Sequence, residues 1–172
     1  ASDGRMFPVI STVGNHENTE DLDKLFDVPE PEVYYAMNFG GNLFRLYSLN
    51  SETDACTDVI QKGWFTNDLD QYSTSSNYTY WKIVQYHQPM VPQAQYGPRS
   101  DMIQCWAPLF DQHKVRLVLE SHTHVLHTSY PVVTSSDTAA YEGFIRNDSL
   151  GYVFTGGGTW GAPRRSPYSA FP

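Results

Sequence analysis

The stretch PVISTVGNHE, residues 8 to 17, decides how the whole chain is interpreted. Its β-branched content predicts a buried strand from Pro8 to Val13. The apolar run stops at a glycine, and Asn15, His16 and Glu17 follow directly. An amide, an imidazole and a carboxylate are side chains that ligate metals or transfer protons. The end of this strand is therefore a candidate functional position.

Two further apolar runs end in the same way. WKIVQY, residues 81 to 86, is followed by His87, and VRLVL, residues 115 to 119, is followed by a segment that contains His122 and His124. In open α/β sheets, ligands collect outside the carboxyl ends of the strands. We therefore expect one asparagine and four histidines to converge at one edge of a sheet.

The rest of the chain predicts strands mixed with helices. Gly40-Gly41-Asn42 predicts the turn of a hairpin. Helices are expected over residues 21–26, 58–72 and 100–112, the last one split by Pro108. The second helix should bury an apolar stripe that includes Val59, Ile60 and Phe65. Further strands are expected over residues 33–39, 43–50, 130–134 and 151–155. These elements predict one α/β domain, residues 1–172, in which mixed β-sheets are flanked by helices.

Charge and hydropathy exclude two classes of function. The chain has 11 basic and 19 acidic residues, and its net charge of -8 excludes the basic face typical of a nucleic-acid-binding protein. No apolar run approaches the ~20 residues needed to cross a bilayer. We therefore expect neither a nucleic acid nor a membrane as a partner.

Cysteine usage and sequons bear on the compartment. Cys56 and Cys105 form either one disulfide or two ordinary packed thiols. Lysine is scarce, and two glycosylation sequons occur, at Asn77 and Asn147. These features favour a secreted, extracellular or periplasmic glycoprotein.

The strand-end residues carry distinct expectations. His122 and His124, on an extended segment, would face the same side and reach either one metal or each member of an adjacent pair. His16 should point away from Asn15, which leaves it for proton transfer or substrate contact. Glu17 is expected to hold the loop or a neighbouring imidazole. Each motif also has an ordinary structural interpretation, as a turn or a packed histidine, and their shared context favours the functional one.

At this point the chain resembles the calcineurin-like metallophosphoesterases, with purple acid phosphatases as the most similar variety. The resemblance rests on VGNHE, His87-x-Pro89, the S-H-x-H of residues 121–124 and the terminal GGG-x-W-G, and it covers about residues 8 to 163. It implies a β-sandwich of two mixed sheets flanked by helices, with two metal ions at the strand ends. It also implies hydrolysis of phosphate monoesters or diesters by a metal-bound hydroxide.

The resemblance assigns roles residue by residue. Asn15, His87 and His122 match the ligands of one metal, and His124 matches a ligand of the other. His16 matches the catalytic histidine that contacts the phosphate and assists the leaving group. The ions would be divalent or trivalent, of the Fe, Zn or Mn type.

The segment GGGTWGAPRR, residues 156 to 165, is a candidate rim of the substrate pocket. Its glycines allow close approach of the backbone to a ligand. Trp160 is expected to form a substrate-binding wall, and Arg164 or Arg165 would attract phosphate. A solvated tail is the alternative interpretation of the two arginines.

The chain departs from the family in its upstream part. The Asp-x-His and Gly-Asp motifs that precede GNHE in the family have no counterpart here, so this chain supplies at most one well-liganded ion and a sandwich incomplete at its N-terminal side. The missing strands would leave an apolar sheet edge exposed, so we expect another chain, a swapped copy or an upstream segment to cover it. Ser121 replaces the glycine usual before H-x-H, where a positive φ would be costly.

Three functional hypotheses follow. The first is a phosphoesterase whose site is completed by upstream or partner residues. The second is a non-catalytic remnant of the same fold that acts as a binding or structural subunit. The third is a single-metal hydrolase in which His16 acts as the base.

Overall fold

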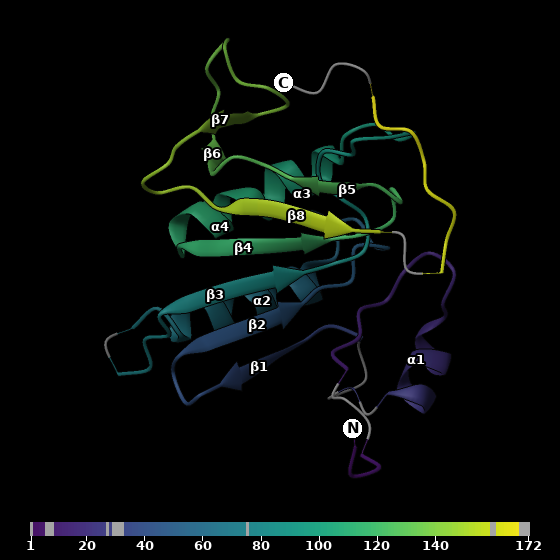
Figure 1. The fold of residues 1–172 in the computed structure, drawn as a ribbon. Coiled ribbons are helices and arrows are strands. Elements are labelled where there is room, and N and C mark those ends of the chain that lie inside the picture. The colour runs from purple at the N-terminus through teal and green to yellow at the C-terminus, as the bar shows by residue number, and fades with distance from the viewer. Residues whose placement is uncertain are drawn as a thin grey trace.

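The computed structural model describes residues 2–5, 9–26, 28, 33–74, 76–158 and 161–168. Figure 1 shows the elements in their spatial arrangement. In chain order they are α1 (Thr19–Leu25), β1 (Tyr35–Phe39), β2 (Phe44–Ser48), α2 (Val59–Gln71), β3 (Trp81–Gln85), α3 (Ser100–Cys105), α4 (Ala107–Gln112), β4 (Val115–Glu120), β5 (Leu126–Thr128), β6 (Val132–Thr134), β7 (Phe144–Arg146) and β8 (Val153–Gly157).

Six strands form one mixed sheet in the order β1-β2-β3-β4-β8-β5, and β6 and β7 form a separate two-stranded sheet. The inner strands β2, β3, β4 and β8 are parallel, whereas β1 and β5 pair antiparallel at the two edges. The carboxyl ends of the four parallel strands therefore meet at one side of the sheet, where the N-terminal and C-terminal segments also run (Figure 1). The predicted α/β class with a mixed sheet is confirmed.

The predicted hairpin is β1–β2. Phe39 pairs with Phe44 next to the turn, and the two rings stack with centroids 4.6 Å apart. Gly40 and Gly41 have φ angles of 60° and 67°. Glycine reaches this left-handed region without the steric cost that a Cβ would add, so the two glycines permit the tight turn.

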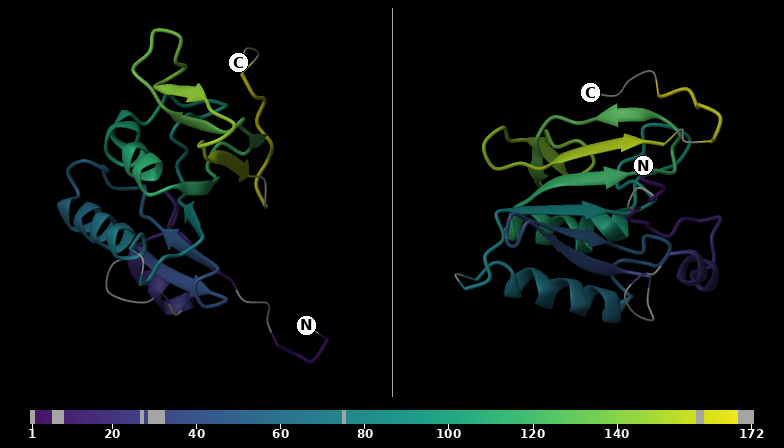
Figure 2. Two further views of the ribbon diagram at one scale, coloured as in Figure 1. Left: turned by 90° about the vertical axis from the view of Figure 1, so that its left-hand side faces the viewer. Right: turned by 60° about the horizontal axis from the view of Figure 1, so that its bottom comes forward.

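One face of the sheet is covered by the helices. Tyr47, Val84, Val118 and Phe154 stand opposite one another in the register of β2, β3, β4 and β8, and all are buried. Helices α2, α3 and α4 lie against this face (Figure 2). Their side chains complete the core, in which Trp106 is fully buried.

The opposite face of the sheet is also apolar. Because successive side chains of a strand point to opposite faces, the next row faces away from the helices. This row consists of Leu46, Ile83, Leu117 and Val153. Only Leu46 of the four is buried, and Trp81, two residues before Ile83 on β3, is 53% exposed. The face is therefore apolar yet only partly covered by the described residues.

Helix α2 agrees with the prediction in its extent but not in its buried face. Asp58 caps it by accepting from the backbone N–H of Gln61. Phe65 is buried as expected, whereas Val59 and Ile60 are 71% and 69% exposed. Gln61 is buried in their place, because its carboxamide donates to and accepts from the backbone of the preceding loop.

The third predicted helix is split, as expected from Pro108. Helix α3 ends before Trp106, and α4 begins at Ala107, with the proline in its first turn. Proline has no N–H to donate, and the first turn of a helix is where this donor is not needed. The buried indole of Trp106 anchors the break.

The predicted strand from Pro8 to Val13 is wrong for its described part. Residues 9–13 form no strand, and Pro8 lies outside the described residues. The carbonyl of Ser11 instead accepts hydrogen bonds from the side chains of Tyr35, Ser48 and Gln85. These side chains satisfy the backbone where a neighbouring strand would otherwise do so. Strands β5 and β7, three residues each, were not predicted.

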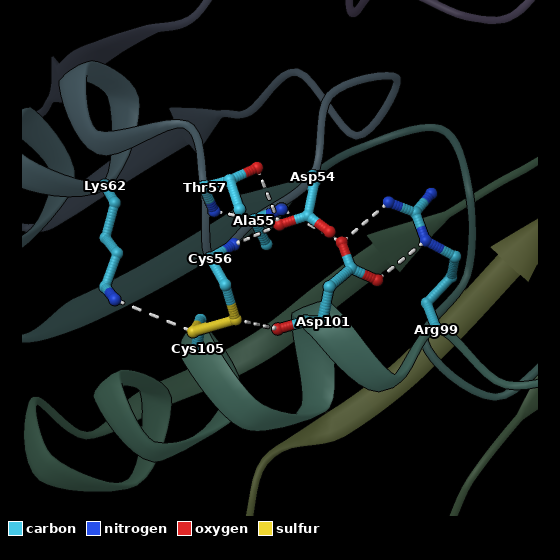
Figure 3. Close-up of a disulfide and its surroundings, with 8 residues drawn as sticks. All are labelled: Asp54, Ala55, Cys56, Thr57, Lys62, Arg99, Asp101 and Cys105. Atoms are coloured by element: carbon cyan, nitrogen blue, oxygen red, sulfur yellow. Dashed lines mark hydrogen bonds and ion pairs between the residues drawn. A yellow bond between two sulfur atoms is a disulfide. The ribbon is translucent and has the colours of Figure 1, made fainter.

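Cys56 and Cys105 form a disulfide with Cα atoms 5.4 Å apart. The bond ties the loop before α2 to the end of α3 (Figure 3). It resolves the two alternatives left open by the sequence and is compatible with an oxidising compartment. None of the described helices has the length and apolar composition needed to cross a bilayer.

Candidate metal centre

Three of the predicted ligands meet at the carboxyl side of the sheet. Nε2 of His87 lies 2.9 Å from Oδ1 of Asn15 and 3.0 Å from Nδ1 of His122. The rings of His87 and His122 meet edge to face, with centroids 4.9 Å apart. The Asn15 loop and the segments after β3 and β4 thus bring three donor atoms to one point.

The donor set fits one metal ion. An amide oxygen only accepts, so the proton between Asn15 and His87 belongs to Nε2 of His87, which also faces Nδ1 of His122. A cation in place of that proton would face three lone pairs. Two ligands of one Zn²⁺, each about 2.0–2.1 Å from it, are roughly 2.8–3.4 Å apart at angles between 90° and tetrahedral. The observed separations of 2.9 and 3.0 Å lie at the lower end of that range.

A second ion fits less well. Nδ1 of His124 lies 3.0 Å from the carbonyl oxygen of Pro163, so Nδ1 carries the proton and Nε2 is the atom left for a ligand. Within the described residues, no group of three His, Cys, Asp or Glu side chains is arranged to hold a metal ion. The candidate centre therefore depends on one amide and two imidazoles, and of the predicted ligands only His124 remains for a neighbouring ion.

The H-x-H segment is a turn and not the extended segment that was expected. His122 and His124 have φ angles of 63° and 56°, in the left-handed region, and Ser121 is not among the described residues with positive φ. The backbone cost expected at Ser121 therefore falls on the two histidines. Such strain persists where the surroundings hold it, and it is common at functional sites.

The backbone of His87 is held by a buried hydroxyl. Oγ of Ser51 accepts from the N–H of His87 at 3.2 Å and from the N–H of Gln88 at 2.8 Å. Ser51 is completely buried and follows β2 by three residues. Nothing in the sequence around Ser51 marked it as part of the site, because the contact spans 36 residues.

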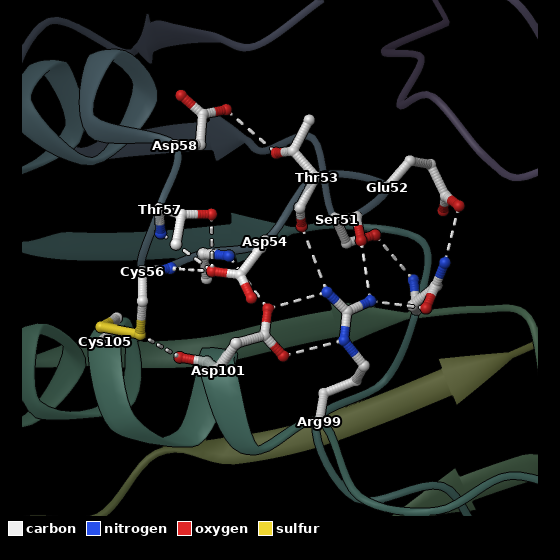
Figure 4. A network of polar contacts seen from close by, with 12 residues as sticks. Ser51, Glu52, Thr53, Asp54, Cys56, Thr57, Asp58, Arg99, Asp101 and Cys105 are labelled. Carbon is white, nitrogen blue, oxygen red and sulfur yellow. Dashed lines mark hydrogen bonds and ion pairs between the residues drawn. A yellow bond between two sulfur atoms is a disulfide. The ribbon is translucent and has the colours of Figure 1, made fainter.

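A guanidinium holds the Ser51 loop in turn. Arg99 donates to the carbonyls of Ser51 and Thr53, to the carboxamide of Gln88 and, through two nitrogens, to the carboxylate of Asp101 (Figure 4). Nε2 of the same Gln88 carboxamide donates to the carboxylate of Glu52 at 2.6 Å. The network joins the loop after β2 to the loop after β3. It thereby fixes the position of the His87 backbone.

The Asn15 loop is closed by Glu17. The N–H of Gly14 donates to Oε2 of Glu17 at 2.9 Å, and the N–H of Glu17 donates to the carbonyl of Gly14 at 3.3 Å. A Cβ on Gly14 would lie 2.8 Å from Glu17 Oε2 and 2.9 Å from His87 Nδ1. Gly14 is therefore needed for the close approach of the His87 ring, and Glu17 contacts the loop as expected.

Burial and neighbouring charges keep the imidazoles of His87 and His122 neutral. Burial, aided by the charges of His122, His16 and His124, lowers the pKa of His87 to about 4. Burial also lowers the pKa of His122, and Arg165 is the next cause. Neutral imidazole is the form that binds metals. His16 is exposed and directly follows Asn15 in the same loop.

A second histidine network lies beside the centre. The buried carboxylate of Glu120, at the end of β4, accepts from the hydroxyl of Tyr86 at 2.7 Å and the N–H of Met90 at 3.0 Å, and it lies 3.3 Å from Nε2 of His127. His127 is therefore a packing residue. Glu120 and His127 line a largely apolar cavity of about 590 Å³ that includes none of the three candidate ligands. Trp160, the predicted substrate wall, lies outside the described residues.

The comparison with protein families bears on this arrangement. The sequence model of the family described as calcineurin-like phosphoesterase matches residues 2–126. The chain belongs to the calcineurin-like phosphoesterase family. The match includes Asn15, His87, His122 and His124. No match was found among curated protein sequences.

A solved structure of the same fold is that of purple acid phosphatase PPD1, isolated from yellow lupin (Lupinus luteus) seeds. The two structures superpose with a TM-score of 0.55 and 19% sequence identity, over 85% of this chain and 27% of the lupin chain. The likeness shows the fold, with its mixed sheet and helices. The present chain thus spans about a quarter of the length of the lupin enzyme.

Proposed function

We propose that this chain carries part of the active site of a metal-dependent phosphoesterase that hydrolyses phosphate monoesters or diesters. The observation that carries the proposal is the meeting of Asn15, His87 and His122, in which Nε2 of His87 lies 2.9 Å from Oδ1 of Asn15 and 3.0 Å from Nδ1 of His122. Membership of the calcineurin-like phosphoesterase family supports the same reaction class.

Each residue has a defined part in this proposal. Asn15, His87 and His122 hold one divalent cation, and Nε2 of His124 is presented to a neighbouring one. Bound metal would supply Lewis acidity toward the phosphate oxygens. His16, exposed beside the trio, gives a proton to the leaving oxygen of the substrate. Its side chain accepts or donates no hydrogen bond among the described residues, so it is available for that transfer.

The proposal includes a segment that completes the site. A second ion needs carboxylates that the described residues do not bring to His124. An upstream segment or a partner chain would supply them, and would cover apolar sheet surface at the same time. The partly exposed row that contains Ile83, Leu117 and Val153 supports this part, since contiguous exposed apolar patches mark interfaces.

A non-catalytic subunit is the second candidate function. It is favoured by one observation, that the described residues bring no group of three His, Cys, Asp or Glu side chains together for a second ion beside His124. In this case the fold would bind one metal and serve as a binding or structural module without turnover.

We also propose export to an oxidising compartment, outside the cell or in the periplasm. The disulfide between Cys56 and Cys105 supports it. Of the two sequons, Asn77 is exposed, whereas the carboxamide of Asn147 accepts from two backbone N–H groups of its own turn. Asn77 is therefore the better acceptor for a glycan, and an intact mass of the natural protein would reveal one.

Metal binding tests the proposed function. Titration of the purified chain with Zn²⁺ or Mn²⁺ in a calorimeter should give one tight site, which His87→Ala abolishes. His16→Ala is the matched control, because it should keep metal affinity and lose most hydrolysis of p-nitrophenyl phosphate in the completed enzyme. Equal metal binding by the wild type and His87→Ala would refute the centre. One metal without turnover, even with the completing segment, would favour the non-catalytic subunit.

A further inference from the structure

The C-terminal segment places one arginine against the candidate metal centre. The backbone N–H of Arg165 donates to the carbonyl of His124 at 3.2 Å. Nη1 of Arg165 lies 3.2 Å from the carbonyl oxygen of His122 and 3.2 Å from the hydroxyl of Tyr96. The Arg165 guanidinium therefore lies beside the turn that carries both histidines.

Tyr96 connects this arginine to the centre. Its ring stacks on the imidazole of His122, with centroids 4.3 Å apart and planes inclined by 30°. The guanidinium of Arg165 lies 5.4 Å from the centre of the Tyr96 ring. The Tyr96 hydroxyl accepts from Arg165, so its own proton remains to be donated to another group.

Arg165 has unused donors. Both of its side-chain hydrogen bonds come from Nη1, and among the described residues neither Nε nor Nη2 meets an acceptor. No carboxylate of the described residues pairs with Arg165. Arg99, the other arginine whose charge reaches His122, is already bound to Asp101 through two nitrogens. Arg165 is thus a half-buried cation whose charge is not neutralised locally.

This local charge matters because the protein as a whole is acidic. A net charge of -8 repels an anionic substrate at long range. A phosphate group that enters the site needs a positive charge there, and a guanidinium fork matches the geometry of two phosphate oxygens. Arg165 has the charge, the free donors and the position to provide this.

We propose that Arg165 and the Tyr96 hydroxyl form a phosphate-binding subsite next to the metal centre. Nε and Nη2 of Arg165 would donate to two non-bridging oxygens, and the Tyr96 hydroxyl would donate to one of them. The subsite deepens the proposed function and rests on it for its role in turnover. Phosphate binding by these residues is nevertheless measurable without any metal.

A purely structural role for Arg165 makes a different prediction. In that role its contact with the carbonyl of His122 only stabilises the left-handed turn. Loss of the arginine would then disturb His122 as a metal ligand. Metal affinity is therefore the readout that separates the two roles.

The experiment compares Arg165→Gln with Arg164→Gln. Arg164 is exposed and makes no contact with Tyr96 or His122 among the described interactions, so its variant removes the same charge without removing the subsite. Inorganic phosphate is titrated into both variants and the wild type by calorimetry, with and without Zn²⁺. Charge-assisted hydrogen bonds are worth about 1.5–3 kcal/mol, so Arg165→Gln should weaken phosphate binding roughly 10- to 100-fold. Zn²⁺ affinity should stay within about threefold, and Arg164→Gln should behave as the wild type.

Several results would overturn the subsite. One is that the wild type does not bind phosphate. Another is that Arg165→Gln and Arg164→Gln weaken phosphate binding equally. The third is that Arg165→Gln loses enough Zn²⁺ affinity to explain its weaker phosphate binding. Tyr96→Phe gives a second check, with an expected loss of about 2- to 10-fold for one neutral hydrogen bond. If the wild type fails to bind Zn²⁺, the proposed function fails, and the titration of the metal-free chain still decides whether Arg165 binds phosphate.

Discussion

Nε2 of His87 lies 2.9 Å from Oδ1 of Asn15, although 72 residues separate them in the chain. The contact exists because two different networks hold the two segments. Side chains from β1, β2 and β3 hold the carbonyl of Ser11 ahead of Asn15, and Ser51 holds the backbone of His87. The distance between Asn15 and His87 therefore depends on these hydrogen bonds, and substitutions that remove them should weaken metal binding.

Gly14→Ala should disrupt the contact between the Asn15 loop and His87. The added Cβ would lie 2.9 Å from Nδ1 of His87, and the imidazole has little room to withdraw because Ser51 holds its backbone. Overpacking of this kind costs about 1–3 kcal/mol. We expect at least about tenfold weaker Zn²⁺ binding by calorimetry, together with a lower melting temperature.

Gly97→Ala is the matched control for this substitution. A Cβ at Gly97 meets no atom within 4 Å, so both readouts should stay at their wild-type values. Wild-type metal affinity in Gly14→Ala would show that the His87 ring does not need the space at Gly14.

Ser51→Ala should displace His87 without touching its side chain. The substitution leaves the N–H groups of His87 and Gln88 without their buried acceptor, at about 1–3 kcal/mol for each unsatisfied group. Thermal unfolding should shift downward and Zn²⁺ affinity should fall together with it. Ser136→Ala, at an exposed serine, is the control. A stable Ser51→Ala protein with unchanged metal affinity would remove Ser51 from the site.

Loss of the disulfide should lower the free energy of unfolding. The bond between Cys56 and Cys105 spans 49 residues, and the chain-entropy relation gives about 4 kcal/mol for a loop of this length. The double substitution to alanine should lower the midpoint of urea unfolding by a corresponding amount. Hydrogen exchange should also rise in the neighbouring loop, whose Ala55 N–H donates to Asp101 (Figure 3). Unchanged exchange there would show that the Arg99–Asp101 pair holds the loop without the disulfide.

Mild acid should destabilise the metal-free protein through His87. Its pKa is lowered from 6.5 to about 4 by burial, so the unfolded chain binds a proton in this window and the folded chain does not. The stability present above pH 6.5 is therefore lost progressively as the pH falls from 6.5 toward 4. Melting temperatures measured across this range should fall more steeply for the wild type than for His87→Gln. Identical slopes would show that His87 is not the group responsible.

The predictions from sequence succeeded where local pattern decides structure. The hairpin follows from Gly40 and Gly41, and the split of the third helix follows from Pro108. The strands β3 and β4 follow from their β-branched runs, and so does the position of His87 and His122 just after them. These features depend on residues within a few positions of one another.

The failures share one cause, which is contact between distant segments. The segment before Asn15 has strand-like composition, yet side chains from β1, β2 and β3 satisfy its Ser11 carbonyl. Gln61 replaced Val59 and Ile60 on the buried face of α2 because its carboxamide bonds the backbone of Asn50. Propensity and periodicity contain no information about such partners.

The amino-acid sequence by itself determined the hairpin, the main helices, the strands β3 and β4, the family and the chemical types of the residues at the strand ends. Only the tertiary structure decided that His122 and His124 lie in a left-handed turn, that Ser51 and Arg99 support His87, and that Arg165 reaches the same place from the C-terminal segment. The physical reason is the distance along the chain over which each kind of interaction acts. Backbone preferences act between near neighbours, whereas these contacts join residues 35 to 48 positions apart and form only when the sheet brings the loops together.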